Sequence, residues 1–267
     1  AASDVYKRQV LTRERNGRQE YLYLANFDWY NYLYDDSRPT WDHNLNIRGA
    51  FKSLSYMVSG RYNQQKGINR IQPDKFRSYN FRVKLQADIT PKLTISNNTK
   101  FFSSEYSYSG MESEYDNFRR PTLHALSSMV PVNPDGTAVS HTSITNSSAH
   151  FLMDGYNAML QKGKSGGHKK VREFSTLFEV QYKIIPQLDI KADFSYTYGN
   201  LRNDYRSVNV EYSQYPGVIQ TEPEGRYPNS LKETVWDQNY YVADIYASFQ
   251  DTWKDLHNFS AILGYNL

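Results

Sequence analysis

Alternation of apolar and polar residues runs through most of this chain and strongly limits its possible folds. From Phe174 to Ile184 nearly every second residue is apolar, and the alternation resumes from Leu188 to Tyr198 after a turn at Pro186-Gln187. Successive side chains on a strand point to opposite faces, so each segment predicts a strand with one apolar and one polar face. Such a face is long for a soluble sandwich and matches the ~10-residue alternating segments of a membrane β-barrel wall.

Three more strand pairs follow the same pattern. They are residues 45–51 with 54–62, residues 79–89 with 93–101, and residues 243–249 with 259–265. Their turns are expected near Lys52-Ser53, at Thr90-Pro91-Lys92 and around Trp253-Lys254-Asp255. The predicted fold class is therefore all-β: an antiparallel transmembrane β-barrel, incomplete, with about eight strands of a larger plugged barrel.

The connections between pairs are long, at about residues 104–172 and 199–238. Short turns alternating with long loops are typical of outer-membrane barrels, whereas a loop of this length is rare in a soluble sandwich. The aromatic residues of the strands are expected to form two interfacial belts. Those at the long-loop ends are Tyr62, Tyr79, Phe101, Tyr196 and Tyr198, and those near the short turns are Phe51, Phe249, Trp253 and Phe259.

Composition excludes several classes of protein. The mean hydropathy of −0.75 is typical of a soluble protein, but alternation averages each barrel strand to near neutrality. The absence of cysteine excludes a disulfide scaffold and a Cys-ligated zinc site. A net charge of +3 is too balanced to indicate nucleic-acid binding. No apolar run is long enough for a transmembrane helix, and residues 1–9 lack the apolar region of a signal peptide.

Two motifs resemble catalytic or nucleotide sites but favour simpler interpretations. Gly163-Lys164-Ser165 matches the end of a phosphate-binding loop, yet Ala158 stands where that motif needs glycine. Asp189 and Asp193 share a strand face, as paired catalytic carboxylates would. Lys191 lies between them on an open polar face, which favours a solvated wall.

Other candidate sites lie in or beside the long loops. Glu105, Glu112, Glu114 and Asp116 stand beside Arg119-Arg120, so they form either an external calcium site or, more simply, a self-neutralised charged loop. The histidines are scattered; a metal site from His124, His141 and His150 has no supporting spacing. We expect no catalytic residue, no metal ligand and no cofactor, so the chain is not expected to be an enzyme.

Two sets of residues are expected to face solute or lumen. Tyr106, Tyr108, Tyr115 and Trp236 lie in or beside the predicted loops. Their rings suit stacking on sugars or packing of a peptide, and loop packing explains them equally well. Arg48, Arg61, Arg82, Lys84 and Lys100 alternate with apolar wall residues and are predicted to face the lumen. Their expected roles are hydration of the lumen and contact with a plug.

Several runs, in order and at matching spacing, resemble one family. They are residues 43–50 (HNLNIRGA), 56–62 (YMVSGRY), 65–68 (QKGI), 76–82 (FRSYNFR), 131–136 (PVNPDG), 257–260 (HNFS) and 263–266 (LGYN). From about residue 25 onward the chain resembles the barrel of SusC/RagA-type TonB-dependent outer-membrane transporters of Bacteroidetes. Ala50 stands where a second glycine is common in that family.

The resemblance implies nutrient uptake across the outer membrane. Members import oligosaccharides or peptides, a SusD-like surface lipoprotein lids the barrel, and TonB-ExbB-ExbD supplies energy through the plug. We expect residues 25–267 to be an internal fragment of such a barrel, embedded in outer-membrane lipid. Residues 1–24 are expected to combine a sequence-assembly artefact at the start with the plug-to-barrel connection. The alternatives are a passive porin or surface adhesin with the same wall, or a soluble glycan-binding β-protein.

Overall fold

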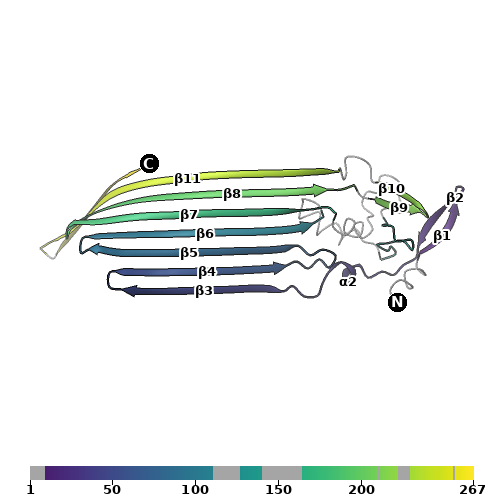
Figure 1. The fold of residues 1–267 in the computed structure, drawn as a ribbon, viewed down its shortest axis with the longest axis horizontal. Helices are drawn as coiled ribbons and strands as arrows, with labels where there is room; N and C mark the ends of the chain where they lie inside the picture. The colour runs from purple at the N-terminus through teal and green to yellow at the C-terminus, as the bar shows by residue number, and fades with distance from the viewer. Residues whose placement is uncertain (1–9, 111–126, 140–163, 210, 222–228, 255) are drawn as a thin grey trace.

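An open antiparallel sheet of eight strands dominates the chain (Figure 1). The computed structural model describes residues 10–110, 127–139, 164–209, 211–221, 229–254 and 256–267. The strands of the large sheet are β3 (Thr40–Phe51), β4 (Leu54–Lys66), β5 (Lys75–Thr90), β6 (Leu93–Ser109), β7 (Gly166–Ile185), β8 (Leu188–Ser207), β11 (Ser230–Trp253) and β12 (His257–Asn266). Each pairs with its neighbours in chain order, and β3 and β12 form the two open edges. The predicted all-β antiparallel fold with about eight strands is confirmed.

The four strand pairs predicted from the alternation are all present. Two-residue turns join three of them, at Lys52-Ser53, Pro91-Lys92 and Pro186-Gln187, and residues 254–256 join β11 to β12. Proline suits such turns because its φ is already set for a turn position. Lys52 takes a positive φ of 50° in its turn. The tight turns therefore all lie at one end of the sheet, and the longer connections lie at the other.

The strands extend further toward the long loops than the alternation predicts. β6 runs to Ser109 and β7 begins at Gly166, while β8 runs to Ser207 and β11 begins at Ser230. The predicted loop bounds, 104–172 and 199–238, are therefore too wide. Backbone hydrogen bonds hold a ladder together whatever the side chains are. The apolar alternation accordingly marks only part of each strand, and polar residues continue the pairing beyond it.

The register joins the apolar positions of all eight strands into one continuous side of the sheet. One row of cross-strand partners contains Phe51, Leu54, Ala87, Ile95, Val180, Ala192, Ile245 and Tyr265. Cross-strand partners point to the same side, so the whole row shares one face. We call this side the apolar face and the opposite side the polar face.

The apolar face is exposed along its length. Phe51 is 69% exposed, Leu45 65% and Leu263 80%. Among the described residues, all the buried apolar side chains lie outside the eight-stranded sheet. An apolar surface of this extent on a soluble protein marks a contact with lipid or with another protein.

The buried apolar residues gather instead at the long-loop end, in what we call the loop-end cluster (Figure 1). It is built from the hairpin β1 (Val10–Arg15) and β2 (Arg18–Tyr23), the helix α2 (Trp29–Leu33), residues 127–139, and the hairpin β9 (Glu211–Tyr215) and β10 (Val218–Thr221). Its core consists of Val10, Tyr21, Trp29, Leu33, Tyr34, Met129, Val130 and Val139. Parts of two long loops, the β6–β7 and β8–β11 connections, thus pack on the segment that precedes the first strand of the sheet.

Backbone hydrogen bonds join residues 127–139 to the N-terminal segment on one side and to the β9–β10 hairpin on the other. The Phe27 amide donates to the Ser127 carbonyl at 2.7 Å, and the Ser213 amide donates to the Ala138 carbonyl at 2.9 Å. The β1–β2 hairpin turns at Asn16-Gly17, where φ is 51° and 73°. Asn-Gly suits a two-residue hairpin turn with positive φ at both positions.

The short helix α2 anchors the loop-end cluster from the N-terminal side. Asp28 caps it, since its side chain accepts a hydrogen bond from the Asn31 amide at 3.0 Å. Trp29 and Leu33, four residues apart, lie on one side of the helix and are buried. No helix among the described residues is long and apolar enough to cross a membrane.

We expect Leu33→Ala to destabilise the loop-end cluster by about 2–5 kcal/mol, because it leaves a cavity where a side chain is only 2% exposed. Hydrogen exchange of residues 127–139 in the full-length protein measures this loss. Leu24→Ala is the matched control: Leu24 is 61% exposed, and its truncation should change stability by less than about 0.5 kcal/mol. Equal exchange in the two variants would contradict the assignment of this core.

Candidate functional site

A cavity of about 480 Å³ opens on the polar face near the long-loop end of β4 to β7. We call it the polar-face cavity. Its lining includes Arg38, Gln65, Asp74, Phe76, Tyr106 and Lys169. The register places four of these in one row across four neighbouring strands: Gln65, Phe76, Tyr106 and Lys169. A row of this kind is the shortest way for a sheet to bring distant parts of the chain to one place.

Three tyrosine rings form a ladder that begins at this cavity, which Tyr106 lines, and continues to Tyr108, which lines a second cavity described below. The Tyr106 and Tyr108 rings lie 5.6 Å apart with 23° between their planes, and the Tyr108 and Tyr205 rings lie 6.4 Å apart at 9°. Gly167, the cross-strand partner of Tyr108, has no room for a side chain: a Cβ there would lie 2.7 Å from the Tyr108 hydroxyl. Glycine therefore allows Tyr108 to lie across β7 toward Tyr205 on β8.

Groups of both charges surround the cavity. Arg38 donates from Nη2 to Gln65 Oε1 at 3.1 Å, and Tyr106 donates from its hydroxyl to Asp74 Oδ2 at 3.4 Å. Lys169 adds a second cation to the lining. The cavity thus combines flat aromatic surface with donors and one carboxylate. This combination can bind a polar solute that carries rings, amides or charged ends.

The four aromatic residues predicted to contact solute have different outcomes. Tyr106 and Tyr108 lie in β6 on the polar face rather than in a loop, because the strand continues to Ser109. Trp236 lies in β11 on the same face, but three strand spacings from β6, or about 14 Å. Tyr115 is outside the described residues. The structure therefore brings together two of the predicted residues and leaves Trp236 apart from them.

Tyr205 was not predicted from the sequence as a site residue, and neither were Arg38, Asp74 and Lys169 of the cavity lining. Tyr205 lies on the polar face of β8, as do the other odd-numbered residues Thr197, Gly199 and Leu201. That parity was available in the sequence, but the strand was expected to end near residue 199. Only the observed length of β8 shows that Tyr205 belongs to the same face as Tyr108.

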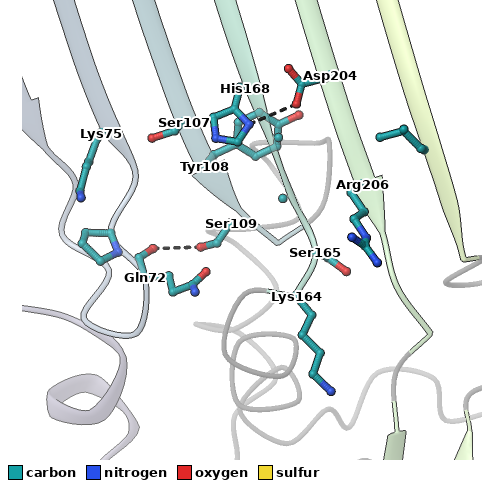
Figure 2. A pocket seen from close by; sticks show the side chains of 14 residues that line it. Gln72, Lys75, Ser107, Tyr108, Ser109, Lys164, Ser165, His168, Asp204 and Arg206 are labelled. Carbon is teal, nitrogen blue, oxygen red and sulfur yellow. Dashed lines mark hydrogen bonds and ion pairs between the residues drawn. The ribbon is translucent and has the colours of Figure 1, made fainter.

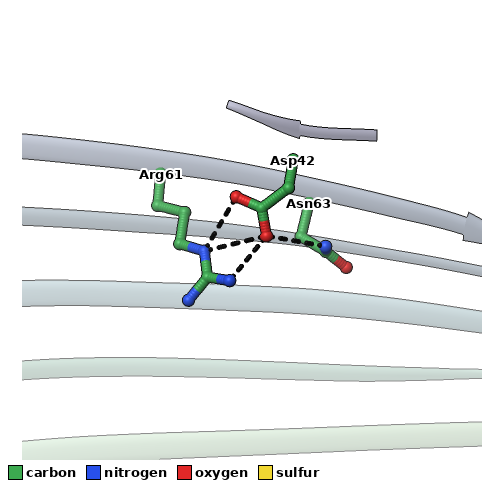
Figure 3. Close-up of polar contacts among 3 residues, drawn as sticks. All are labelled: Asp42, Arg61 and Asn63. Carbon is green, nitrogen blue, oxygen red and sulfur yellow. Dashed lines mark hydrogen bonds and ion pairs between the residues drawn. The ribbon is translucent and has the colours of Figure 1, made fainter. Parts of the chain in front are cut away.

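The five basic residues predicted to face the lumen share the polar face. Arg48, Arg61, Arg82, Lys84 and Lys100 occupy polar-face positions of β3 to β6. Arg61 is paired with Asp42 (Figure 3). Its Nε donates to Asp42 Oδ1 at 3.0 Å, and its Nη2 donates to Asp42 Oδ2 at 2.5 Å. Asn63 Nδ2 donates to the same carboxylate at 3.2 Å.

Two acidic side chains of the polar face, Glu179 on β7 and Asp189 on β8, are also tied to neighbours. Lys191 forms an ion pair with Glu179, and Gln181 Nε2 donates to Asp189 Oδ2 at 3.3 Å. Within the described part of the chain, no group of three or more His, Asp or Glu side chains is placed to bind a metal ion. Several residues that the sequence suggested for a metal or phosphate site lie outside the described residues: Glu112, Glu114, Asp116, His124, His141, His150 and Gly163.

A second cavity, of about 580 Å³, lies at the long-loop rim of the sheet (Figure 2). We call it the rim cavity. Its lining includes Lys75, Ser107, Lys164, His168, Asp204 and Arg206. Four of the strand residues among these, Lys75, Ser107, His168 and Asp204, form a row on the apolar-face side of the register. His168 Nδ1 lies 3.1 Å from Asp204 Oδ2.

A tyrosine–carboxylate pair lies in the loop-end cluster. Tyr21 donates from its hydroxyl to Asp135 Oδ2 at 2.7 Å, and Thr137 donates to the other carboxylate oxygen. Burial, then the bond to Asp135, raises the pKa of Tyr21. Burial alone would raise the pKa of Asp135, but hydrogen bonds from Thr137 and Tyr21 outweigh it and lower that pKa. The cluster therefore favours a neutral phenol beside an ionised carboxylate.

No protein-family model matches the chain, and no curated protein matches it. The structure of the RagAB peptide transporter is similar in fold, with a TM-score of 0.61 and 16% identity over 91% of this chain and 25% of the matched chain. The RagAB peptide importer in its closed-closed state gives a TM-score of 0.61 and 15% identity over 99% and 28%. Its open-open state gives a TM-score of 0.63 and 16% identity, over 100% of this chain and 28% of the matched chain. The chain thus shares the fold of these proteins and spans about a quarter of the matched chains' length.

The Tyr21–Asp135 pair predicts how the stability of the loop-end cluster depends on pH. The lowered pKa of Asp135 adds stability above its ordinary value of 3.8, and this is lost as the pH falls through the lower folded value. The raised pKa of Tyr21 adds stability below 10.0 that is lost only as the pH rises through the higher folded value. We expect hydrogen-exchange protection of residues 127–139 to fall on acidification below about pH 4.

Asp135→Asn isolates the carboxylate. This variant should lose about 1 kcal/mol at neutral pH, since the carboxylate is exposed enough for solvent to screen it, and its protection should no longer fall in acid. Protection that falls equally in the variant would show that another group causes the acid sensitivity.

Proposed function

We propose that this chain forms part of the wall of an outer-membrane importer for peptides or oligosaccharides. The observation that carries the proposal is the height of the apolar band. On the apolar face of β8 it runs from Leu188 to Tyr198, and on β5 from Tyr79 to Ile89. Both lengths fall in the ~9–11 residues that a barrel strand needs to cross the hydrocarbon core.

The polar side chains within the apolar band support contact with lipid. Thr99 and Thr176 hydroxyls lie 2.9 Å apart, Thr99 donates to Asn97 Oδ1 at 2.9 Å, and Asn97 Nδ2 donates to Thr176 at 3.0 Å. Polar groups that face hydrocarbon are costly unless they bond to one another. This mutual pairing is what a lipid-facing wall requires.

The opposite face suits a water-filled interior. Arg48, Lys84 and Lys100 have positions on it that no described element covers. Charged residues on this face would hydrate a lumen and contact a plug, as the barrel architecture requires. Closure of the barrel needs further strands at β3 and β12, whose outer edges are unpaired.

The polar-face cavity supports a peptide as the preferred solute. Its Tyr106 ring, two cations and one carboxylate match the rings, amides and charged ends of a peptide. The similar structures are described as a peptide transporter and a peptide importer. An oligosaccharide remains the second candidate because stacked tyrosines also bind the faces of sugars.

The remaining parts of the proposal concern partners and energy. We infer that the whole protein acts with a SusD-like surface lipoprotein and receives energy from TonB-ExbB-ExbD through a plug. The wall would perform no covalent chemistry and would need no cofactor. The likeness in fold to the RagAB structures supports a role in an uptake assembly. The lipoprotein and the TonB components are part of the proposal.

The genomic locus distinguishes this proposal from its rivals. A plug domain encoded upstream, further strands downstream and a neighbouring gene for a SusD-type lipoprotein would support the importer. A complete reading frame that ends near Leu267 and lacks a plug would overturn it. That result would favour a small passive barrel, an adhesin or a soluble β-protein.

We expect Tyr106→Ala and Lys169→Gln, made in the full-length protein, each to weaken peptide binding about tenfold, through loss of stacking and of a charged contact. Calorimetric titration with a library of short peptides measures the change. Tyr240→Ala and Lys100→Gln are matched controls, since both side chains are exposed on the polar face outside the cavity. Binding of neutral oligosaccharides but not peptides would overturn the preference for a peptide.

We expect Val83→Arg to cost about 2–4 kcal/mol, because it places a charge near the middle of the apolar band. Assembly of the full-length protein in outer-membrane fractions measures this effect. Asn80→Arg, on the polar face of the same strand, is the matched control and should assemble normally. Normal assembly of Val83→Arg would reverse the assignment of the two faces.

A further inference from the structure

Four cations gather on the apolar-face side of the sheet, at its long-loop rim. Arg77 on β5 and Lys170 on β7 are the two cross-strand partners of Glu105 on β6. Lys75 lies two residues beyond Arg77, and Arg172 lies two residues from Lys170 toward the middle of the sheet. We call Lys75, Arg77, Lys170 and Arg172 the rim cations.

The rim cations begin where the apolar band ends. Arg172 belongs to a row with Tyr79 and Ser103. The next row toward the turns contains Phe81, Phe101, Phe174 and Tyr198. Rows on one face are about 7 Å apart along the strands, so the charges follow this aromatic row within one to three such steps.

The rim cations carry an excess of positive charge. No ion pair involves any of the four within the described ranges, whereas on β8 and β11 Arg202 Nε lies 2.7 Å from Glu233 Oε1. Glu105 is the one carboxylate in the rows that hold Arg77, Lys170 and Arg172 between β5 and β7. Asp204, which pairs with His168, stands in the row of Lys75. These two carboxylates oppose an anion at the rim, and the four cations outweigh them.

The rim cavity adjoins this charge and gives it a recess. Lys75 lines the cavity together with Lys164 and Arg206 (Figure 2). The hydroxyl groups of Ser107 and Ser109 belong to the same lining. Ser109 donates to the Gln72 carbonyl at 2.9 Å. A volume of about 580 Å³ can hold a phosphate with the sugar or glycerol that bears it.

We propose that the rim cations and the rim cavity bind the phosphate-bearing headgroup of an outer-leaflet lipid. A lipid whose chains lie along the apolar face, past the aromatic row, brings its phosphate to this level. Guanidinium and ammonium groups bind phosphate by charge-assisted hydrogen bonds. The solute cavity is lined by Phe76, Tyr106 and Lys169, none of which lines the rim cavity, so the two ligands have separate sites. This inference rests on the proposed function, because it requires the apolar face to contact lipid.

Titration of the full-length protein in neutral detergent with phosphorylated lipid A tests the proposal. Each cation near a lipid phosphate contributes about a fivefold gain in affinity, so Arg77→Gln, Lys170→Gln and Arg172→Gln together should weaken binding about a hundredfold. Glu105→Gln should strengthen it about fivefold, since it removes the opposing charge. Arg48→Gln, Lys84→Gln and Lys100→Gln remove the same number of charges from the polar face and should leave the affinity unchanged.

The outcomes separate this proposal from its premise. Unchanged lipid A affinity in the rim variant, or weakening by Glu105→Gln, would overturn lipid binding here while peptide import stays intact. Equal binding of dephosphorylated lipid A would also overturn it. Competition by millimolar inorganic phosphate with the same loss in the rim variant would show a free-anion site instead. A full-length protein that remains dissolved without detergent would overturn the proposed function itself.

Discussion

The register of the backbone ladder is the constraint on which the rest of this structure depends. Seven antiparallel pairings keep each apolar position opposite another, from Phe51 on β3 to Tyr265 on β12. A slip of one residue in any pairing would turn the following strands over. The two faces, the rim charges and the tyrosine ladder all exist because no such slip occurs across the centre of the sheet.

Two kinds of stabilisation follow from this arrangement. The loop-end cluster has a dry core of its own, with Val130 and Val139 fully buried, and is stabilised as a water-soluble domain is. The large sheet has no such core among its described residues and presents Leu45 and Leu263 to its surroundings. Its backbone bonds are satisfied within the ladder, except at the edges, while its apolar face depends on a medium other than water.

Much of this arrangement could be predicted from local pattern. Alternation identified the four strand pairs, and Pro91 and Pro186 marked two of their turns. Hairpins without strong alternation were missed, although Asn16-Gly17 and Pro216-Gly217 are turn signals. The loop-side ends of the strands were placed too close to the turns. Beyond Phe174 and Tyr198 the positions on the apolar face become polar, while the backbone pairing continues.

The sequence by itself determined the strands, their turns and the separation of apolar from polar side chains, because these follow from a period of two residues and from turn chemistry. The tertiary structure alone decided which distant residues meet. Tyr108 reaches Tyr205, Arg77 and Lys170 flank Glu105, and residues 127–139 pack on the N-terminal hairpin. These contacts depend on strand order and on the lengths of the loops, which connect residues far apart in the chain and leave no local periodic pattern.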